Sequence, residues 1–274
     1  MVRVTTLYAT DPETAKGLDT AGIRERFHVP GMFADGEIRL TCTHYDRMMV
    51  GGAVPAGSDL VLDAVAETGT DTWLARREAG ILNIGDTGTI IVGGETYELE
   101  KGDILYVGMG AGAVTFGGKG RFYIVSTPAH QTYPTTLAKP ADANEVKLGS
   151  ADTSNDRTIY QFIHEGGVKS CQLVMGYTKL HGGSVWNTMP AHTHDRRMEA
   201  YLYFDVADGQ RVFHFMGEPQ ETRHILMAGE EIVVSPPWSI HAGAGTGAYT
   251  FCWAMAGDNM AFTDMDMVAV EDLR

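Results

Sequence analysis

Three histidines and one glutamate carry the clearest chemical signal in this sequence. His192 and His194 stand two positions apart, Glu199 follows shortly after them, and His241 comes after a segment that contains two adjacent prolines. Because side chains alternate between the two faces of a β-strand, His192 and His194 would point the same way and could chelate one ion. Glu199, at the start of the next strand, can add a carboxylate oxygen, and His241 can complete the site from an adjacent strand.

This set of ligands suits zinc, manganese, iron or nickel, and ligand type alone does not choose among these metals. Neutral imidazoles and one carboxylate leave a divalent ion with net positive charge, so it could act on an anionic or carbonyl substrate. A single His-x-His pair is more often a surface or core feature than a ligand pair. The glutamate and the later histidine make a metal site the better interpretation here.

Short β-branched and aromatic segments broken by glycine predict an all-β chain with a few short helices. In the first half these segments are 37–45, 47–54, 87–99 and 121–126. In the second half they are 158–163, 171–180, 198–206, 211–217, 222–228, 230–235 and 248–255. Gly93-Gly94 predicts a two-residue hairpin turn. One helix is expected over 21–27, capped by Asp19 or Thr20.

Two parts of the chain resemble each other. Residues 75–116 and 195–245 each contain Arg-Arg followed closely by Glu, a strand, a turn, a hairpin and a glycine-acid pair before an aliphatic strand. This order favours duplication of one antiparallel barrel. The predicted domains are therefore an N-terminal half, 1–135, without metal ligands, a polar connector, 136–157, and a C-terminal metal-binding half, 158–274.

The net charge of −14 opposes binding to nucleic acid, which requires clustered Lys and Arg. An anionic ligand would have to be attracted by a local basic group or a metal. No stretch of about 18 apolar residues predicts a membrane-spanning helix, and the start has no apolar core of signal-peptide length. Three widely spaced cysteines argue against a disulfide framework, so a cytoplasmic location is expected. The acidic tail, 264–274, is expected to pack on the surface.

The arrangement of His192, His194, Glu199 and His241 resembles the metal-binding motif of the cupin superfamily. Two copies of this barrel or jelly-roll would make a double cupin. One departure is Trp238, which stands where cupins usually have a glycine before the last histidine. In the first half no histidine belongs to a His-x-His pair, so that half is expected to be structural or to serve assembly.

A narrower resemblance, to the 5-keto-4-deoxyuronate isomerase family, extends from about residue 17 to the end of the chain. It is carried by segments 17–27, 43–52, 76–85, 128–135, 186–204, 216–227, 235–255 and 264–274, among which WNTMPAHTHDRRMEAYLYF is the most specific. The family's zinc ligands fall on the four residues named above. The resemblance implies a zinc-dependent ketol-isomerase of pectin breakdown. It would convert 5-dehydro-4-deoxy-D-glucuronate to 3-deoxy-D-glycero-2,5-hexodiulosonate, as a cytoplasmic homohexamer.

Isomerisation through an enediol needs a group that stabilises the enediolate and a group that carries the proton. Glu199 is a poor free base if it binds the ion, which leaves a hydroxide on the ion or a nearby side chain. Strand parity points Tyr201 and Tyr203 inward with Glu199, and further candidates on neighbouring strands or turns are His214, Glu218, Glu221 and Arg223. We take Glu199, Tyr201, Tyr203 and His214 as the catalytic candidates, although a structural role is the alternative for each.

A uronate carboxylate would be recognised best by a guanidinium, whose planar fork matches it. Arg196, Arg197 and Arg223 are the candidates. The alternative for Arg196 and Arg197 is pairing with acids at the surface or between subunits, because Arg76-Arg77 recurs in the half without metal ligands.

Two other functions use the same ligands. A cupin dioxygenase would bind iron and consume O₂, and a non-catalytic sugar-binding cupin would bind a uronate without turnover.

Overall fold

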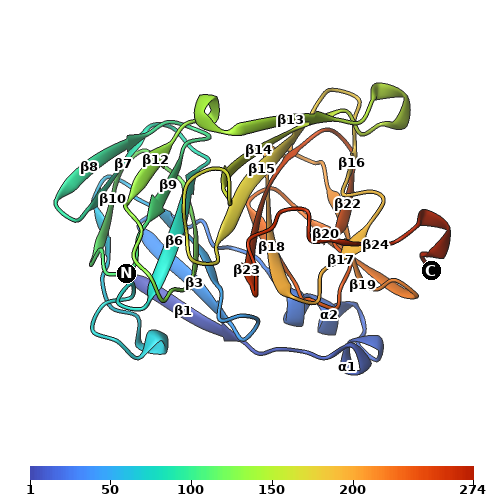
Figure 1. Ribbon diagram of the computed structural model, residues 1–274, viewed down its shortest axis with the longest axis horizontal. Helices are drawn as coiled ribbons and strands as arrows, with labels where there is room; N and C mark the ends of the chain where they lie inside the picture. The colour runs from blue at the N-terminus through green and yellow to red at the C-terminus, as the bar shows by residue number, and fades with distance from the viewer. The chain divides into compact units, whose positions relative to one another are not determined.

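β-strands make up almost all regular structure in the computed structural model, which describes residues 1–274 (Figure 1). The helices are α1 (Pro12–Lys16), α2 (Thr20–Phe27) and the 3-10 turns η1 (Ala66–Thr68), η2 (Pro140–Asp142), η3 (Ala151–Thr153) and η4 (Val270–Asp272). The predicted helix is confirmed: the side chain of Asp19 accepts a hydrogen bond from Gly22 N at 2.8 Å, and Ile23 and Phe27 are buried. None of the helices is long and apolar enough to cross a membrane.

The chain forms two units, of which the first comprises residues 1–7, 31–143 and 162–175. Its larger sheet has the order β1 (Val2–Leu7), β3 (Glu37–Thr43), β4 (Met49–Val54), β11 (Phe122–Pro128), β6 (Arg77–Asn83), β9 (Ile104–Val107), β12 (Thr136–Ala138). Its smaller sheet has the order β5 (Leu60–Leu62), β10 (Val114–Gly118), β7 (Gly88–Val92), β8 (Glu95–Leu99). The hairpin prediction is confirmed, because Val92 pairs with Glu95 and both Gly93 and Gly94 have positive φ.

The second unit, residues 8–30, 144–161 and 176–274, repeats this plan. Its larger sheet has the order β13 (Asn144–Leu148), β14 (Arg157–Ile163), β15 (Val174–Leu180), β23 (Thr250–Gly257), β18 (Arg197–Phe204), β21 (Glu231–Ser235), β2 (His28–Val29). Its smaller sheet has the order β16 (Trp186–Asn187), β22 (Ala242–Gly245), β19 (Val212–Glu218), β20 (Glu221–Met227). A short extra pair joins β17 (His192–Thr193) to β24 (Asp266–Met267). Both units thus have sheets of seven and four strands, which confirms the double-cupin, all-β prediction.

The units do not follow the sequence halves strictly. Residues 8–30 belong to the second unit, where His28 pairs with Val233 of β21, and residues 162–175 belong to the first. The boundaries at 1–135, 136–157 and 158–274 therefore remain a prediction about sequence segments. The predicted connector also contains regular structure, since β13 pairs with β14 from Asn144↔Gln161 to Leu148↔Arg157. Its side chains are mostly exposed, which explains why an edge strand has the polar composition of a loop.

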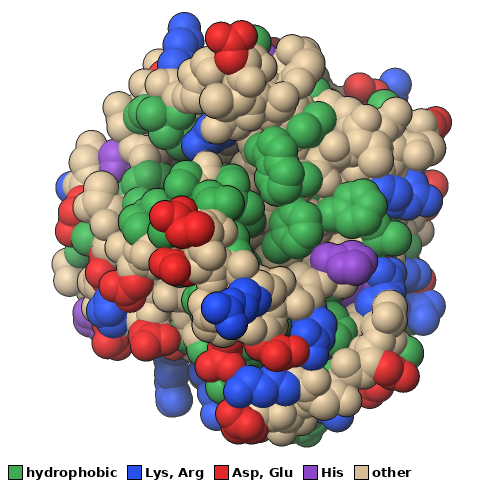
Figure 2. All heavy atoms as spheres, turned by 90° about the vertical axis from the view of Figure 1, so that its right-hand side faces the viewer, with side chains coloured by type: hydrophobic (Ala, Val, Ile, Leu, Met, Phe, Trp, Pro, Cys, Tyr) green, Lys and Arg blue, Asp and Glu red, His purple; other side chains and the backbone are tan.

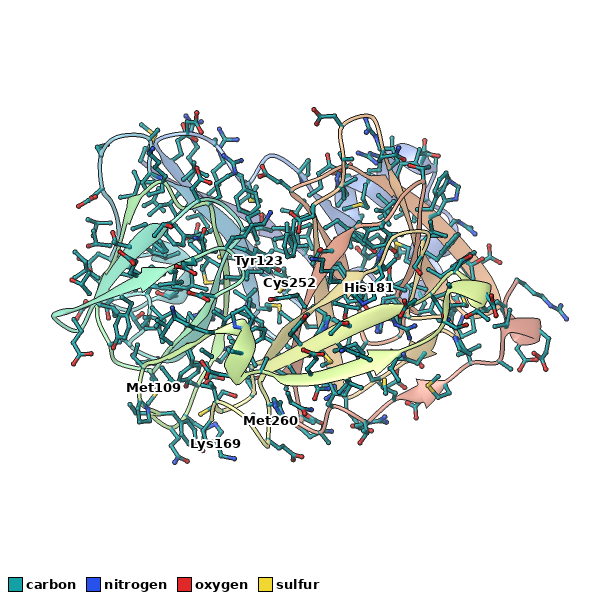
Figure 3. All side chains as sticks on the ribbon, turned by 90° about the horizontal axis from the view of Figure 1, so that it is seen from above. Met109, Tyr123, Lys169, His181, Cys252 and Met260 are labelled. Carbon is teal, nitrogen blue, oxygen red and sulfur yellow. The ribbon has the colours of Figure 1, made fainter.

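The interior of the first unit is filled by apolar side chains from both sheets. Ile81 and Ile124 of the larger sheet pack in one cluster with Ile90 and Phe116 of the smaller one. Ala79 also belongs to this cluster, whereas the preceding residue, Glu78, points to the other face of the sheet because side chains alternate along a strand. All three cysteines of the chain are free, and Cys252 on β23 (labelled in Figure 3) is fully buried.

Glu78 is a fully buried carboxylate with an unusual number of partners. Its oxygens accept hydrogen bonds from three consecutive backbone N–H groups, those of Cys171, Gln172 and Leu173, at 2.7, 2.9 and 2.9 Å. The hydroxyl of Tyr106 donates a fourth at 2.8 Å. Glu78 therefore fixes residues 171–173 within the first unit.

Candidate metal centre

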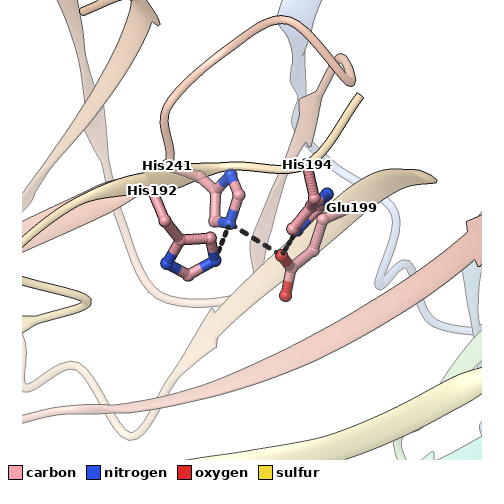
Figure 4. Close-up of side chains that lie close together, drawn as sticks. All are labelled: His192, His194, Glu199 and His241. Carbon is pink, nitrogen blue, oxygen red and sulfur yellow. Dashed lines mark hydrogen bonds and ion pairs between the residues drawn. The ribbon is translucent and has the colours of Figure 1, made fainter. Parts of the chain in front are cut away.

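The four predicted ligands converge in the second unit (Figure 4). His241 Nε2 lies 3.0 Å from His192 Nε2 and 2.9 Å from Glu199 Oε2, and His194 Nε2 lies 3.1 Å from the same carboxylate oxygen. One donor atom from each residue lies within 4.8 Å of the others, and all four side chains are buried. The structure thus brings all four predicted ligands together.

Local backbone structure positions each ligand. His192 is held by the pairing of β17 with β24, opposite Met267. After His194 the chain bends, with Arg197 N donating to His194 O at 3.0 Å, and β18 then points Glu199 into the unit. Trp238 occupies the turn before His241, where its indole N–H donates to Thr10 O and its ring packs edge-on against Phe27. These contacts secure a turn that cupins usually make with glycine.

The hydrogen bonds behind the imidazoles fit a metal site. His194 Nδ1 donates to the carbonyl of Arg197 at 2.8 Å, because a carbonyl oxygen can only accept. In the neutral ring this leaves the Nε2 lone pair free for an ion, and such a bond to a backbone carbonyl is the usual support of a ligating histidine. Donor atoms that are each about 2.1 Å from one ion lie about 3 to 4 Å apart. The three closest pairs in this cluster are 2.9 to 3.1 Å apart, and all four donor atoms lie within 4.8 Å of one another.

The ionisation of His192 and Glu199 also fits. Burial, together with nearby His241, lowers the pKa of His192 to about 3, so the ring is neutral and able to bind a metal. For Glu199, burial acts to raise the pKa, but His241 and His194 outweigh it and hold the pKa below its usual range. For His194, burial acts to lower the pKa, but the hydrogen bond and charge of Glu199 outweigh it and raise the pKa, so a metal would have to displace a proton from this ring. The cluster therefore offers three imidazoles and one carboxylate, and its residues would hold a divalent ion.

A cavity of about 250 Å³ opens on this cluster and is lined by residues of the second unit. Its wall contains His192, Glu199 and Tyr201 on the metal side. The rest is mainly apolar and rich in sulfur and aromatic rings, with Phe251, Trp253, Met255, Phe262, Met265 and Met267. Such a cavity suits a small molecule with few polar anchor points.

Of the catalytic candidates beyond the ligands, Tyr201 lies in the cavity wall. Its hydroxyl is 3.1 Å from Thr188 Oγ1, and its ring lies against that of His241. Burial, and then the charge of Glu199, raises the pKa of Tyr201 well above its ordinary value. Tyr201 is therefore protonated at neutral pH and can donate a hydrogen bond or a proton.

Tyr203 and His214 lie deeper, outside the cavity lining. The hydroxyl of Tyr203 is 2.8 Å from His214 Nδ1, and both side chains are fully buried. Burial lowers the pKa of His214 to about 3, so its ring is neutral. The inward direction predicted for Tyr201 and Tyr203 is confirmed by their mutual ring contact, but the structure brings only Tyr201 to the cavity. Glu218 and Glu221, on the β19–β20 hairpin, pair with Lys16 and Arg223.

The three arginines expected to bind substrate lie outside the cavity lining. Arg196 forms ion pairs with Asp264 and Asp266, and Arg223 pairs with Glu221 and donates to Lys16 O. Arg197 is fully buried and donates to the carbonyls of Ala261 and Asp264. Arg196 and Arg197 thus secure the segment 261–266, which supplies Phe262 and Met265 to the cavity wall.

Two features of the site were missed from the sequence. The tail does more than pack on the surface, because β24 pairs with the strand of His192 and Met267 lines the cavity. Arg157 also lines the cavity, at the start of β14. Arg157 is the last residue of the predicted connector, 136–157. No feature of the sequence indicated that this residue would lie at the site.

A duplicated β-sandwich with three histidines and a glutamate converging in one copy defines the chain as a double cupin with a candidate metal centre in its second unit. The chain belongs to the KduI/IolB family, whose model matches residues 28–271.

Relatives and solved structures agree with this assignment. The chain is 64% identical over its full length, and that of the relative, to a 4-deoxy-L-threo-5-hexosulose-uronate ketol-isomerase of Cereibacter sphaeroides. It is 60% identical, again over both full lengths, to the protein of that name from Agrobacterium fabrum. An IolB-like protein from Salmonella typhimurium shares the fold, with a TM-score of 0.63, 13% identity, and coverage of 81% of this chain and 86% of that one. Oxalate decarboxylase of Bacillus subtilis does so with a TM-score of 0.54, 8% identity, and coverage of 78% and 70%.

Proposed function

We propose that this protein is a metal-dependent ketol-isomerase. It converts 4-deoxy-L-threo-5-hexosulose uronate, also called 5-dehydro-4-deoxy-D-glucuronate, to 3-deoxy-D-glycero-2,5-hexodiulosonate in the breakdown of pectin and related uronates. The observation that carries the proposal is the convergence of His192, His194, Glu199 and His241 on one cavity, in a chain 64% identical to relatives with that activity in their name.

The reaction is an internal redox exchange between two neighbouring carbons and needs no external oxidant. A proton leaves C2, its electron pair forms the C1=C2 bond, and the aldehyde oxygen takes up a proton to give an enediol. The O2 hydroxyl then loses its proton, the C2=O bond forms, and C1 takes up a proton. A divalent ion supplies Lewis acidity that polarises the aldehyde and stabilises the negative charge on the enediolate oxygens.

The chain's own residues provide the rest of the chemistry. The protonated Tyr201 hydroxyl in the cavity wall can donate to a substrate oxygen while charge develops on it. The apolar wall, including Phe251 and Trp253, keeps bulk water from the enediol and strengthens these polar interactions. Tyr203 and His214 support the strand that carries Tyr201 through their buried hydrogen bond.

Replacing Tyr201 with phenylalanine is expected to lower kcat about a hundredfold, because positioned proton donors commonly contribute that much, while the metal content stays unchanged. Tyr203→Phe is the matched comparison, because Tyr203 lies on the same face of β18 as Tyr201 but outside the cavity lining. Its hydroxyl is hydrogen-bonded to His214 of β19 instead. It should lose much less activity. Steady-state kinetics and elemental analysis of both variants check this. Equal kcat values for Tyr201→Phe and the unmodified enzyme would remove Tyr201 from the reaction.

The proposal includes zinc as the metal, a cytoplasmic location and a homohexamer. A buried set of three imidazoles and one carboxylate is compatible with zinc, and zinc is the metal that the family resemblance implies. An apolar outer face on the smaller sheet of the second unit supports assembly. There Phe213 and Leu226 are 36% and 43% exposed, and the ring of Trp186 stacks on that of Phe215. Figure 2 shows hydrophobic side chains gathered on the side of the molecule that lies to the right in Figure 1, bordered by charged ones.

Leu226→Asp is expected to shift the molecular mass in solution to smaller species, because it places a charge on this apolar face. Light scattering checks this, with Val61→Asp, an exposed apolar residue of the first unit, as the control. An unchanged mass for Leu226→Asp would exclude the face from the assembly.

The experiment that tests the proposed function is a metal-replete assay on the deoxyuronate with elemental analysis of the same sample. We expect turnover with about one metal per chain. Oxygen consumption with an iron-loaded sample and a diketone or catechol would favour a dioxygenase. Tight uronate binding without turnover would favour a sugar-binding cupin.

A further inference from the structure

Arg157 is the only lysine or arginine among the residues that line the cavity. It is the first residue of β14 and pairs across the sheet with Leu148 of β13, at the edge of the larger sheet in the second unit. Its side chain is half-buried, and it shares the wall with Tyr201 and with His192 and Glu199 of the metal cluster.

This guanidinium has no acidic partner in the chain. Its Nη1 donates to the backbone carbonyl of Asn155 at 2.8 Å. Burial lowers the pKa of Arg157, and no carboxylate acts against this effect. A guanidinium remains charged under these conditions, so a cation is held partly out of water with most of its donors unused.

Holding the charge of Arg157 partly out of water without a partner of opposite charge costs free energy. The chain has 35 Asp and Glu residues, yet none of them forms an ion pair with Arg157. Two of the three arginines predicted from sequence show the contrast: Arg196 and Arg223 each form ion pairs with carboxylates, whereas Arg197 donates to two backbone carbonyls. A guanidinium without a carboxylate partner, on a side chain that lines a cavity, therefore offers a binding site for an anion from outside. Because the net charge of −14 opposes anion binding, such a local cation would help the metal to attract an anion to this cavity.

We propose that Arg157 binds the carboxylate of the substrate and makes the site specific for uronates. This inference rests on the proposed function. In the hexosulose uronate, the aldehyde and hydroxyl that react lie at one end of the carbon chain and the carboxylate lies at the other. The cavity wall contains a group for each end of this molecule, two metal ligands and one guanidinium, among mostly apolar residues. A neutral sugar would leave the guanidinium unpaired, and this penalty would discriminate against it.

The test compares Arg157→Gln with Arg211→Gln, which removes the same charge from an exposed arginine of the second unit. Arg157→Gln should raise the KM for the uronate about 30- to 100-fold with kcat changed less than about threefold, because a binding contact is lost in ground and transition state alike. Arg157→Lys should give an intermediate KM, since it restores the charge without the planar fork. Arg211→Gln should behave as the unmodified protein, and all variants should retain their metal.

Substrate analogues separate carboxylate binding from other roles. With the carboxamide of the same hexosulose, the unmodified enzyme and Arg157→Gln should have KM values within about twofold of each other, because the charged partner is absent. Equal KM values for the uronate in both proteins, or an equal loss with uronate and carboxamide, would overturn the proposal. A large fall in kcat at unchanged KM would do the same.

A binding measurement keeps this test independent of turnover. Calorimetric titration with the uronate reduced to an alcohol at C1, which cannot isomerise, should show weaker binding to Arg157→Gln by the same factor of about 30 to 100. If the unmodified protein binds this ligand through Arg157 but converts no uronate, the isomerase function fails while the carboxylate site stands. If the protein converts uronates but Arg157→Gln binds the C1 alcohol as tightly as the unmodified protein, the isomerase function stands and this inference fails.

Discussion

Replacing His192 with alanine is expected to remove the bound metal and the isomerase activity together. His192 Nε2 lies 3.0 Å from His241 Nε2 in the cluster of four predicted ligands. Without His192, the cluster keeps two imidazoles and one carboxylate. Loss of a metal ligand and of Lewis-acid stabilisation should lower kcat by about a thousandfold or more. The measurement is steady-state turnover and elemental analysis on the same preparation.

The matched control is His224→Ala. His224 is an exposed histidine on β20, where its ring packs against Phe213 outside the metal cluster. It should retain about one metal per chain and full activity. A His192→Ala protein that is metal-free and fully active would contradict the proposed mechanism.

The second large effect concerns stability. Replacing Glu78 with alanine is expected to lower the free energy of unfolding by about 3–5 kcal/mol. The substitution leaves the N–H groups of Cys171, Gln172 and Leu173 and the hydroxyl of Tyr106 without their acceptor in a buried position. Urea unfolding at neutral pH, followed by fluorescence, measures the change.

Glu98→Ala provides the control, because Glu98 is an exposed glutamate on β8 of the same unit. Its cost should stay within about 0.5 kcal/mol. A cost of less than about 1 kcal/mol for Glu78→Ala would show that residues 171–173 find other partners, and the assigned role of Glu78 would be wrong.

The repeat explains what sequence comparison could and could not predict. Both halves contain Arg-Arg followed by Glu, which suggests that Glu78 corresponds to Glu199. The strand register shows otherwise: Ala79 pairs with Val107 and Ser126, as Glu199 pairs with Ser235 and Met255. The second half has one extra residue, Met198, between the arginine pair and the glutamate. Because one extra residue moves the next side chain to the other face of a strand, Glu78 points away from the interior and Glu199 points into it. Ala79 occupies the place of the ligand, so the first unit lacks this site.

Three of the four metal ligands were predictable because they obey local rules, whereas His241 reaches the cluster from the segment between β21 and β22. Parity places His192 and His194 on one side, and a short bend brings Glu199 after them. The role of Arg157 was not predictable, because it depends on which distant strands border the cavity and on which other arginines find partners. For the same reason Arg196 and Arg197 were expected at the substrate, whereas they hold the segment 261–266.

The polar connector and the tail show a related limit. β13 has mostly exposed side chains, so its sequence resembles a loop although its backbone pairs with β14. The short pairing of β24 with β17 leaves little sequence signal, although it brings Met267 to the cavity. Both segments are ordered by partners far away in the chain, and periodicity within a segment does not report such partners.

Isomerisation is expected to depend on an ion held by the cluster of His192, His194, Glu199 and His241. The most direct measurement removes metal with a chelator and restores zinc in steps, while product formation is followed by NMR. The account predicts that the rate falls to background and then rises in proportion to zinc up to about one ion per chain. Undiminished formation of 3-deoxy-D-glycero-2,5-hexodiulosonate by the metal-free protein would contradict it.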